Sequence, residues 1–322
     1  MSNTSETRQL LIDTAERIFA DHCNKAALDA TERGEFPAAL WQTLRDNGFH
    51  ELALAGSGVP LGDTFAVLQV AARHAVPLPL TEILLANRWL DSGAQLATVG
   101  LLQGAAIIDA PWARGADVVL GIDTDTGELV QQGRTMGEVV PGSNMAGEAR
   151  DRVTLAPGAA RSVQSEPAFE LIALGRAVAI SGTLQRILTL TLQYANEREQ
   201  FGRSISKFQA IQHNLAVMAG EVAAASRAAD AAIDALDTDR FGLEVAAAKA
   251  RIGEAAGVVA EIAHQVHGAM GYTHEHTLHH FTRRVWAWRD EYGNETWWQA
   301  RLGRHLAALG ADQLWGFLAT RG

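Results

Sequence analysis

Residues 208–236 read FQAIQHNLAVMAGEVAAASRAADAAIDAL, and their pattern decides the fold. Apolar side chains recur at alternating spacings of three and four residues, at Phe208, Ile211, Leu215, Met218, Val222, Ala225, Ala229, Ala232 and Leu236. This heptad-like rhythm places them on one face of a long helix and is typical of a helix bundle. Residues 180–192 and 252–266 repeat the rhythm. The C-terminal half is therefore predicted to be an antiparallel bundle of four or more helices.

The N-terminal region is also predicted to be helical. Residues 5–22 form an amphipathic pattern, and a second helical pattern stops at Asn47-Gly48, a typical helix C-terminus. Further helical pattern over residues 62–94 is interrupted by Pro77 and Pro79. Residues 1–97 are therefore predicted to form an all-α unit.

The sequence changes character between residues 98 and 162. Short β-type runs appear at 106–108 and 118–120, and Asp125-Thr126-Gly127 fits a hairpin turn. We predict a small antiparallel β unit of four to six strands over 98–162. The expected organisation is all-α over 1–97, β over 98–162 and a four-helix bundle over 163–322, a mostly α fold.

Composition excludes several classes of protein. The net charge of -10 argues against a nucleic-acid partner, because phosphate binding needs clustered Lys and Arg. A single cysteine, Cys23, excludes an internal disulfide and fits a reducing cytoplasm. Acidic residues near the N-terminus argue against a signal peptide, and no uncharged stretch approaches the ~20 apolar residues of a membrane span. A cytoplasmic protein without a membrane span is predicted.

Two motifs carry a resemblance to a known family. Residues 194–209 read YANEREQFGRSISKFQ and resemble the "ER..FG..I..FQ" signature of acyl-CoA dehydrogenases. Residues 265–272 read QVHGAMGY and resemble the "Q..GG.G" turn of the same family at the expected distance downstream. The resemblance covers the whole chain in architecture, while its sharp motifs lie in 194–293. It implies an acyl-CoA dehydrogenase-like fold.

The resemblance also implies a FAD cofactor that lies across a subunit interface. Arg198 would reach the pyrophosphate of the neighbouring subunit's FAD, because a guanidinium forms a bidentate fork to phosphate oxygens. Phe201 and Gln209 would line the adenosine half. The second motif would approach the cofactor closely through its backbone, at Gln265, Gly268 and Ala269.

Each of these residues also admits a simpler structural interpretation. Arg198 can be a surface charge at a helix end. The run 206–209 fits a capping box in which the Gln209 side chain bonds the Ser206 amide, and Gly268 fits a helix C-cap. The joint presence of both motifs at the right separation favours the family interpretation.

Two flavin-cradling segments expected from the resemblance are missing. We find neither a "TEP..GSD" strand-turn nor a "W..T/S" strand, and Trp112 lacks a following Thr or Ser. The β unit over 98–162 is short for the family and is expected to be truncated. The chain is therefore predicted to be a poor host for the reactive half of its own flavin.

The catalytic base is the second expected loss. Removal of an α-proton from an acyl-CoA thioester needs a carboxylate with a raised pKa. The family register places Tyr292 at the base position, and a tyrosine has a reference pKa of about 10. The base position of other subfamilies falls on Ile172, and Glu170 is rotated from it by about 200° on a helix. Glu291, one residue from the register, is the one catalytic candidate.

The octet WRDEYGNE, residues 288–295, has an alternative interpretation as an acidic helix N-terminus. Its carboxylates would favour the positive end of the next helix dipole, with Asn294 as N-cap. On one helix, Glu291 and Glu295 would share a face.

A histidine-rich segment follows the second motif. His276 and His280 stand four residues apart beside Glu275, so a divalent metal site is conceivable. The spacing matches no known zinc motif, and the family pattern places an ordinary polar loop here. No metal is predicted.

The retained and missing features together resemble the short, degenerate subunit of heteromeric steroid-CoA dehydrogenases. The chain would complete the FAD site of a full-length acyl-CoA dehydrogenase partner in trans, within a heterotetramer. The complex would oxidise an acyl-CoA, steroid-derived by resemblance, to the trans-2-enoyl-CoA and pass electrons to an electron-transfer flavoprotein. The alternatives are a self-sufficient homo-oligomer that uses Glu291 as base and a non-catalytic scaffold without FAD.

Overall fold

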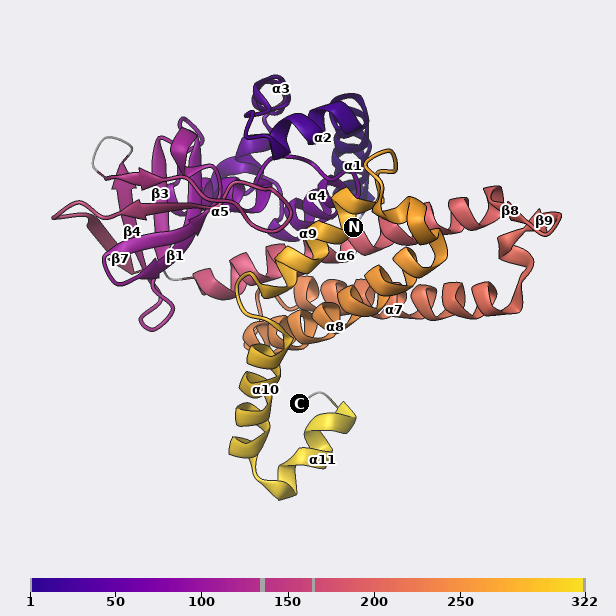
Figure 1. The fold of residues 1–322 in the computed structure, drawn as a ribbon. Helices are drawn as coiled ribbons and strands as arrows, with labels where there is room; N and C mark the ends of the chain where they lie inside the picture. The colour runs from indigo at the N-terminus through magenta and orange to yellow at the C-terminus, as the bar shows by residue number, and fades with distance from the viewer. Residues whose placement is uncertain (1, 134–136, 164–165, 321–322) are drawn as a thin grey trace.

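The computed structural model describes residues 2–133, 137–163 and 166–320, and its chain passes from helices through a sheet to a helix bundle (Figure 1). The N-terminal helices are α1 (Ser2–His22), α2 (Lys25–Glu32), α3 (Ala38–Asp46), α4 (Leu61–Arg73) and α5 (Leu80–Leu90). Helix α3 stops before Asn47, and Gly48 has a φ of 72°, as the stop signal predicts. The two prolines separate α4 from α5, also as predicted.

The sheet is larger than predicted and mixed. It has seven strands in the order β5-β6-β2-β1-β3-β4-β7. Their bounds are β1 (Ala97–Gln103), β2 (Ala106–Ala110), β3 (Val118–Ile122), β4 (Glu128–Gly133), β5 (Val139–Val140), β6 (Asp151–Thr154) and β7 (Ala160–Val163). The prediction of four to six antiparallel strands is therefore wrong in two respects. β1 and β3 pair in parallel, because the chain leaves β2 on one side of β1 and returns on the other, and β5 is too short to show a sequence pattern.

The predicted turn between β3 and β4 is confirmed. The backbone N–H of Asp123 donates to the carbonyl of Glu128 at 2.9 Å, and the N–H of Gly127 donates back to the carbonyl of Asp123 at 2.9 Å. The hairpin that it closes pairs Ile122 with Leu129.

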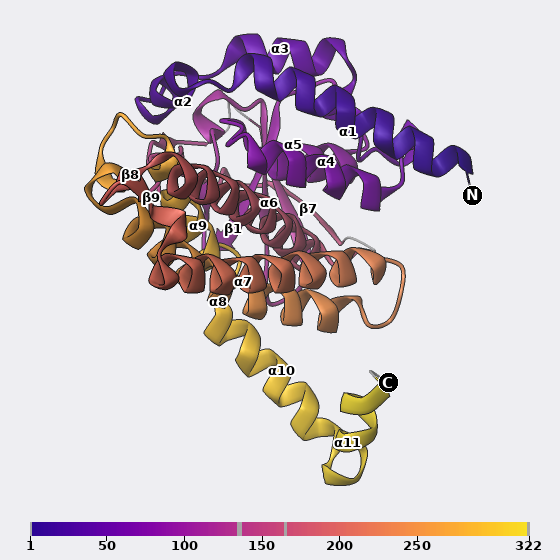
Figure 2. The ribbon, with the colours of Figure 1, turned by 90° about the vertical axis from the view of Figure 1, so that its right-hand side faces the viewer.

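The C-terminal half is the predicted bundle. Its helices are α6 (Ala168–Glu197), α7 (Gln209–Asp234), α8 (Phe241–His267) and α9 (Leu278–Asp290), followed by α10 (Glu295–Leu309) and α11 (Ala311–Thr320). The middle of the predicted α7 stripe is buried, at Met218, Val222, Ala225, Ala229 and Ala232. Both ribbon views show α10 and α11 reaching away from the body of the molecule (Figures 1 and 2).

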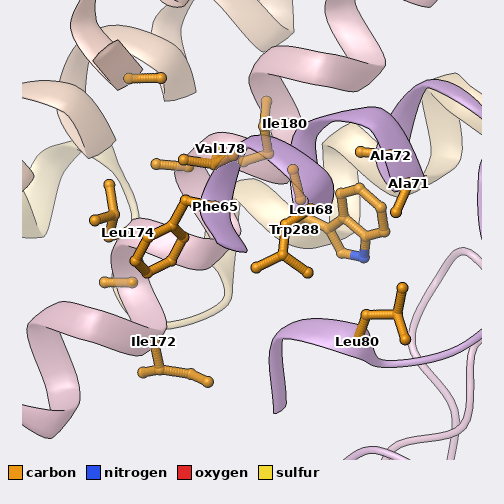
Figure 3. Packing of buried hydrophobic residues seen from close by; sticks show 14 of the residues in the cluster. Phe65, Leu68, Ala71, Ala72, Leu80, Ile172, Leu174, Val178, Ile180 and Trp288 are labelled. Atoms are coloured by element: carbon orange, nitrogen blue, oxygen red, sulfur yellow. The ribbon is translucent and has the colours of Figure 1, made fainter. Parts of the chain in front are cut away.

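Helix α6 is the central helix of the core. It is the one helix of the described residues long and apolar enough to cross a membrane, but 83% of its most apolar window is buried inside the protein. In Figure 3, Phe65 and Leu68 of α4 lie against Leu174 and Val178 of α6, with Trp288 of α9 beside them. This packing places the N-terminal helices directly on the bundle.

Candidate functional site

The two sequence motifs meet at one end of the bundle. The first motif runs from the end of α6 through a hairpin of β8 (Glu199–Gln200) and β9 (Arg203–Ser204) into α7, and the second lies at the end of α8. The rings of Tyr194 and His267 stack at 4.4 Å, which joins the motifs directly. The hairpin projects at the end of α6 opposite the sheet (Figure 1). The structure therefore brings together two motifs that 55 residues separate in the sequence.

The tip of this hairpin is exposed and strained. Phe201 and Gly202 are its two turn residues, with φ values of 53° and 76°. The left-handed region suits glycine and is unfavourable for phenylalanine. The Phe201 side chain is 92% exposed. An apolar ring held in a strained turn, without cover from its own chain, fits a surface that a partner or cofactor covers.

Arg198 carries an available positive charge at this end. It is the C-cap residue of α6 and is exposed. Within the described residues its guanidinium makes no hydrogen bond or ion pair. An unpaired exposed guanidinium can accept an anion such as a pyrophosphate without first breaking a salt bridge. The other predicted cofactor residues are exposed at the same end, at Gln209, Gln265, Gly268 and Ala269.

Two simpler interpretations of this motif can be assessed directly. The capping box is wrong, because Phe208 is the N-cap of α7, and the Ser206 amide donates instead to the Ser204 hydroxyl oxygen at 3.3 Å. Gly268 does cap α8, with a φ of 57°. Its C-cap geometry and its exposed surface are compatible with a cofactor approaching the backbone.

Tyr292, the predicted base position, is bonded to its own chain. Tyr292 is buried, has a φ of 56° and donates its hydroxyl hydrogen to Glu82 Oε1 at 3.0 Å. Burial, and next the negative charge of Glu82, raise the pKa of Tyr292 well above its usual value. The other family position, Ile172, is also fully buried in the core. Neither predicted position therefore presents an ionised carboxylate.

Glu291 is held in ion pairs. Its carboxylate accepts hydrogen bonds from Arg150 Nε at 2.9 Å and Asn144 Nδ2 at 3.0 Å, and it pairs with Arg176 Nη2 at 2.9 Å. Burial alone would raise the pKa of Glu291, but the two guanidiniums outweigh it and hold the pKa below its usual value. This direction is opposite to the raised pKa that a base for this chemistry needs.

The octet divides between two helices. Helix α9 ends at Asp290 and α10 begins at Glu295, so Glu291 and Glu295 share no helix face, contrary to the prediction. Asn294 is the N-cap of α10, as predicted, since its side chain accepts from the Trp297 amide at 3.0 Å. Gly293 has a φ of 89°, and a Cβ there would lie 2.7 Å from Trp298 Nε1.

Six charged residues beside and below Tyr292 are linked by ion pairs, and we call them the ion cluster: Glu82, Glu148, Arg150, Arg176, Arg284 and Glu291. Three carboxylates and three guanidiniums balance to zero charge. Arg176 forms ion pairs with both Glu82 and Glu291. Glu148 forms ion pairs with Arg150 at 3.1 Å and with Arg284 at 3.0 Å. Burial would raise the pKa of Glu148, but Arg150 and Arg284 outweigh it and lower the pKa to about 2.

The sequence contained a signal for this cluster. Arg176 interrupts a long apolar run of α6, and Glu82 stands within PLTEILLA. Charges in such runs are buried only when paired. What the sequence did not show is which partner each charge would find.

The cavity at the ion cluster is small. It measures about 50 Å³ and is lined by Glu82, Trp112, Arg150, Arg176 and Trp288 among others. Trp112 is buried edge-on against Phe36, with ring centroids 5.4 Å apart. Ligand pockets for molecules of substrate size measure roughly 300–1,000 Å³. This cavity is therefore too small for a substrate. Tyr292 and Glu291 line a separate cavity of about 480 Å³, together with Asp109, Asn144 and Arg150 among others, and its size is within that range.

The predicted histidine pair is not a unit in the structure. The His276 ring lies against His267, at 4.7 Å between centroids, whereas His280 Nδ1 bonds Glu32 Oε1 at 2.7 Å. His276 thus belongs with the second motif, and His280 faces α2.

His267 gives the second motif a pH dependence. Burial lowers the pKa of His267 to about 4, so the neutral ring is favoured in the fold. The unfolded chain takes up this proton near pH 6.5. The free energy of unfolding is therefore unaffected by this group above pH 6.5 and falls by on the order of 2 kcal/mol as the pH drops from 6.5 to 4.

His267→Phe should make the free energy of unfolding depend less on pH. Measured by urea unfolding between pH 7 and 4.5, it should fall less steeply for His267→Phe than for the native chain. His213→Phe, at an exposed site on α7, is the control; a slope unchanged in His267→Phe contradicts the prediction.

Comparisons with known proteins show relatives of the chain and structures that share its fold. Residues 164–295 match the family described as "Acyl-CoA dehydrogenase, C-terminal domain". Acyl-CoA dehydrogenase IpdE2 of Mycobacterium tuberculosis is 30% identical over 304 residues, covering 87% of this chain and 91% of that protein. The ChsE4-ChsE5 complex from Mycobacterium tuberculosis contains a chain with a TM-score of 0.86 at 21% identity, covering 95% of this chain and 98% of that chain. A variant of the Tcur3481-Tcur3483 steroid ACAD reaches a TM-score of 0.86 at 23% identity, covering 95% and 99%. The two structures share the fold.

Proposed function

Because the chain belongs to the acyl-CoA dehydrogenase superfamily, we propose that it is the short subunit of a heteromeric, FAD-dependent acyl-CoA dehydrogenase. A full-length partner supplies the flavin-ring cradle and the catalytic base. This chain supplies Arg198, Phe201, Gln209, Gln265, Gly268 and Ala269 to the adenosine and pyrophosphate half of the partner's FAD. The assembly is a heterotetramer in the cytoplasm.

The reaction is the α,β-dehydrogenation of an acyl-CoA thioester. Bound FAD would supply the acceptor for the β-hydrogen as hydride, the partner's base would take the α-proton, and an electron-transfer flavoprotein would reoxidise the complex. A steroid-derived acyl group is the proposed substrate class, which the likeness to a structure titled as a steroid ACAD supports. The role of this chain is to bind and orient the cofactor across the interface.

One observation carries the proposal: Glu291, the one candidate base, is held in ion pairs with a lowered pKa, while the end of the bundle that carries both motifs is exposed. Tyr292 donates to the buried Glu82, and Glu291 accepts from Arg150 and pairs with Arg176, so the carboxylates beside Tyr292 are held by partners of their own chain. At the other end Arg198 is exposed and without a salt bridge among the described residues. A chain with paired carboxylates and an exposed arginine can bind the phosphate end of a cofactor whose reactive ring lies in another subunit.

The flavin-to-chain ratio of the purified complex tests the proposal. The chain is co-expressed with a full-length acyl-CoA dehydrogenase subunit from the same source, and FAD absorbance is compared with the protein concentration. One FAD per two chains is expected. One FAD per chain would mean that this chain holds a complete flavin site and would reject the proposal.

The two alternatives give other results in the same preparation. A self-sufficient homo-oligomer is yellow when purified alone, and its flavin is bleached by acyl-CoA. A scaffold copurifies with a partner whose flavin content does not change when this chain is removed. The proposed short subunit instead binds little flavin alone and raises the partner's flavin content on association.

Glu291→Gln separates a structural from a catalytic role for Glu291. We expect turnover of the complex to stay within about twofold, because the low pKa of Glu291 makes it a poor base. The variant should lose about 1–3 kcal/mol of unfolding free energy, since charged hydrogen bonds to Arg150 and Arg176 are weakened. Asp290→Asn, at the exposed neighbouring residue, is the control in both assays. A turnover loss of a hundredfold or more with flavin retained would make Glu291 the base.

A further inference from the structure

Three potential metal ligands meet where the N-terminal helices contact the bundle. Asp29 lies on α2, and His279 and His280 lie in the first turn of α9. One ligand atom from each residue lies within 4.8 Å of the other two. His280 is 1% exposed and His279 is 9% exposed, so both rings are taken out of water.

Hydrogen bonds orient His279 toward this point. Its Nδ1 lies 2.7 Å from the backbone carbonyl oxygen of His276, and a carbonyl can only accept, so Nδ1 carries a proton and donates. In the neutral ring, Nε2 then presents a lone pair. This atom is buried and has no hydrogen-bond partner within the described part of the chain. A buried acceptor without a partner is costly unless something binds it.

His280 is oriented in the same manner. Its Nδ1 bonds the carboxylate of Glu32 at 2.7 Å, again as a donor. Its Nε2 lies 3.2 Å from Asp29 Oδ1 without hydrogen-bond geometry. In the neutral ring this places a lone pair against a carboxylate oxygen, which is repulsive until a cation lies between them.

Asp29 has one oxygen free for a cation. Its Oδ2 accepts from Lys25 at 2.6 Å, which leaves Oδ1 facing the histidines. The Asp29 side chain is 31% exposed, so the site has a path to solvent. The arrangement thus has two imidazole nitrogens, one carboxylate oxygen and an open side.

We infer that Asp29, His279 and His280 bind a divalent transition-metal ion of the zinc class. Two imidazoles and one carboxylate with a water in the fourth position form a set of ligands that Zn²⁺ takes. Glu32 and the His276 carbonyl hold the outer ring nitrogens, as ligand histidines are commonly held by a carboxylate or carbonyl. Zinc bonds of about 2.0–2.1 Å separate tetrahedral ligands by roughly 3.4 Å, so the widest side of the triangle contracts by at most about 1.5 Å. The ion clamps α2 onto α9.

The site escapes sequence motifs for a geometric reason. Adjacent side chains in the middle of a helix point in different directions, so two adjacent histidines rarely bind one ion. His279 and His280 lie instead in the first turn of α9, where the His279 ring bonds the His276 carbonyl oxygen. The third ligand comes from the N-terminal region, far along the chain. The His276–His280 pair considered from spacing alone shares only His280 with this site.

Zinc binding by the untagged full chain tests the inference. After treatment with a chelator and dialysis, titration with Zn²⁺ should show one ion per chain by calorimetry, with a rise in the thermal midpoint. His279→Gln should weaken Zn²⁺ affinity at least a hundredfold, and Glu32→Gln by about 10–100-fold, as outer hydrogen bonds to ligands do. His213→Gln, the same change at an exposed site on α7, should bind as the native chain does.

A second variant tests the inference if His279→Gln does not fold. Asp29→Asn changes a partly exposed side chain and should weaken Zn²⁺ at least tenfold while the far-ultraviolet circular dichroism stays native. Failure of the native chain to bind one Zn²⁺, or equal affinity in the native chain, His279→Gln, Asp29→Asn and His213→Gln, overturns the inference. The readout is metal binding and stability, so it is independent of any flavin activity.

Discussion

Arg198→Ala should strip FAD from the heteromeric complex while leaving the complex assembled. The guanidinium is exposed and without a salt bridge in the described residues, so its loss removes the proposed phosphate contact and disturbs no internal pair. A charged hydrogen bond contributes about 1.5–3 kcal/mol, which corresponds to a roughly 10–150-fold weaker FAD affinity. Flavin retained after gel filtration, measured by absorbance per mole of complex, is the direct readout.

Two matched variants sharpen this result. Arg198→Lys keeps the charge but loses the bidentate fork, so its flavin retention should fall between those of the native complex and Arg198→Ala. Arg227→Ala removes an arginine whose contact is Asp230 on the exposed surface of α7, and it should retain flavin fully. Full flavin in Arg198→Ala would exclude Arg198 from the cofactor site, whatever the stoichiometry of the complex.

Arg176→Met should cost about 3–5 kcal/mol of unfolding free energy, the largest stability effect that we expect. Arg176 is 4% exposed, pairs with Glu82 and Glu291, and lies over the Trp288 ring at 5.2 Å. Its removal leaves Glu82, which is fully buried, without a counter-charge. Urea unfolding at pH 7, followed by tryptophan fluorescence, measures the loss.

The double variant distinguishes an orphaned charge from a packing defect. Arg176→Met with Glu82→Gln removes the stranded carboxylate and should recover about 1–3 kcal/mol. Arg186→Met, on the exposed face of the same helix, should cost under about 1 kcal/mol. If Arg176→Met is no worse than Arg186→Met, the ion cluster is not a source of stability.

The bundle was predictable because its signal is local. Apolar residues at spacings of three and four predict both a helix and the face that it buries. In α7 the middle of this predicted face is buried. The approach of the two motifs to each other at one exposed end was expected, because the resemblance assigns both to one site. Its assignment to FAD and the limits 1–97, 98–162 and 163–322 remain proposals.

The sheet and the ion cluster were not predictable, because they depend on long-range pairing. The parallel register of Ala97 with Val118 follows from the side on which the chain re-enters the sheet, and no local pattern encodes that side. Similarly, the position of Arg176 in an apolar run predicts a buried charge but does not predict its partners. These are Glu82 on α5 and Glu291 at the end of α9. The same holds for the approach of Asp29 to His280.

The ion cluster also sets an order of events during synthesis. Glu82 and Arg176 leave the ribosome well before Glu291, and at about 5–20 residues per second the delay is on the order of ten seconds. Throughout this interval Arg176 has one of its two carboxylates and Tyr292 has not yet closed over Glu82. Glu82 and Arg176 can therefore pair with each other before α9 is made, but the ion cluster is complete only when the end of α9 arrives with Glu291.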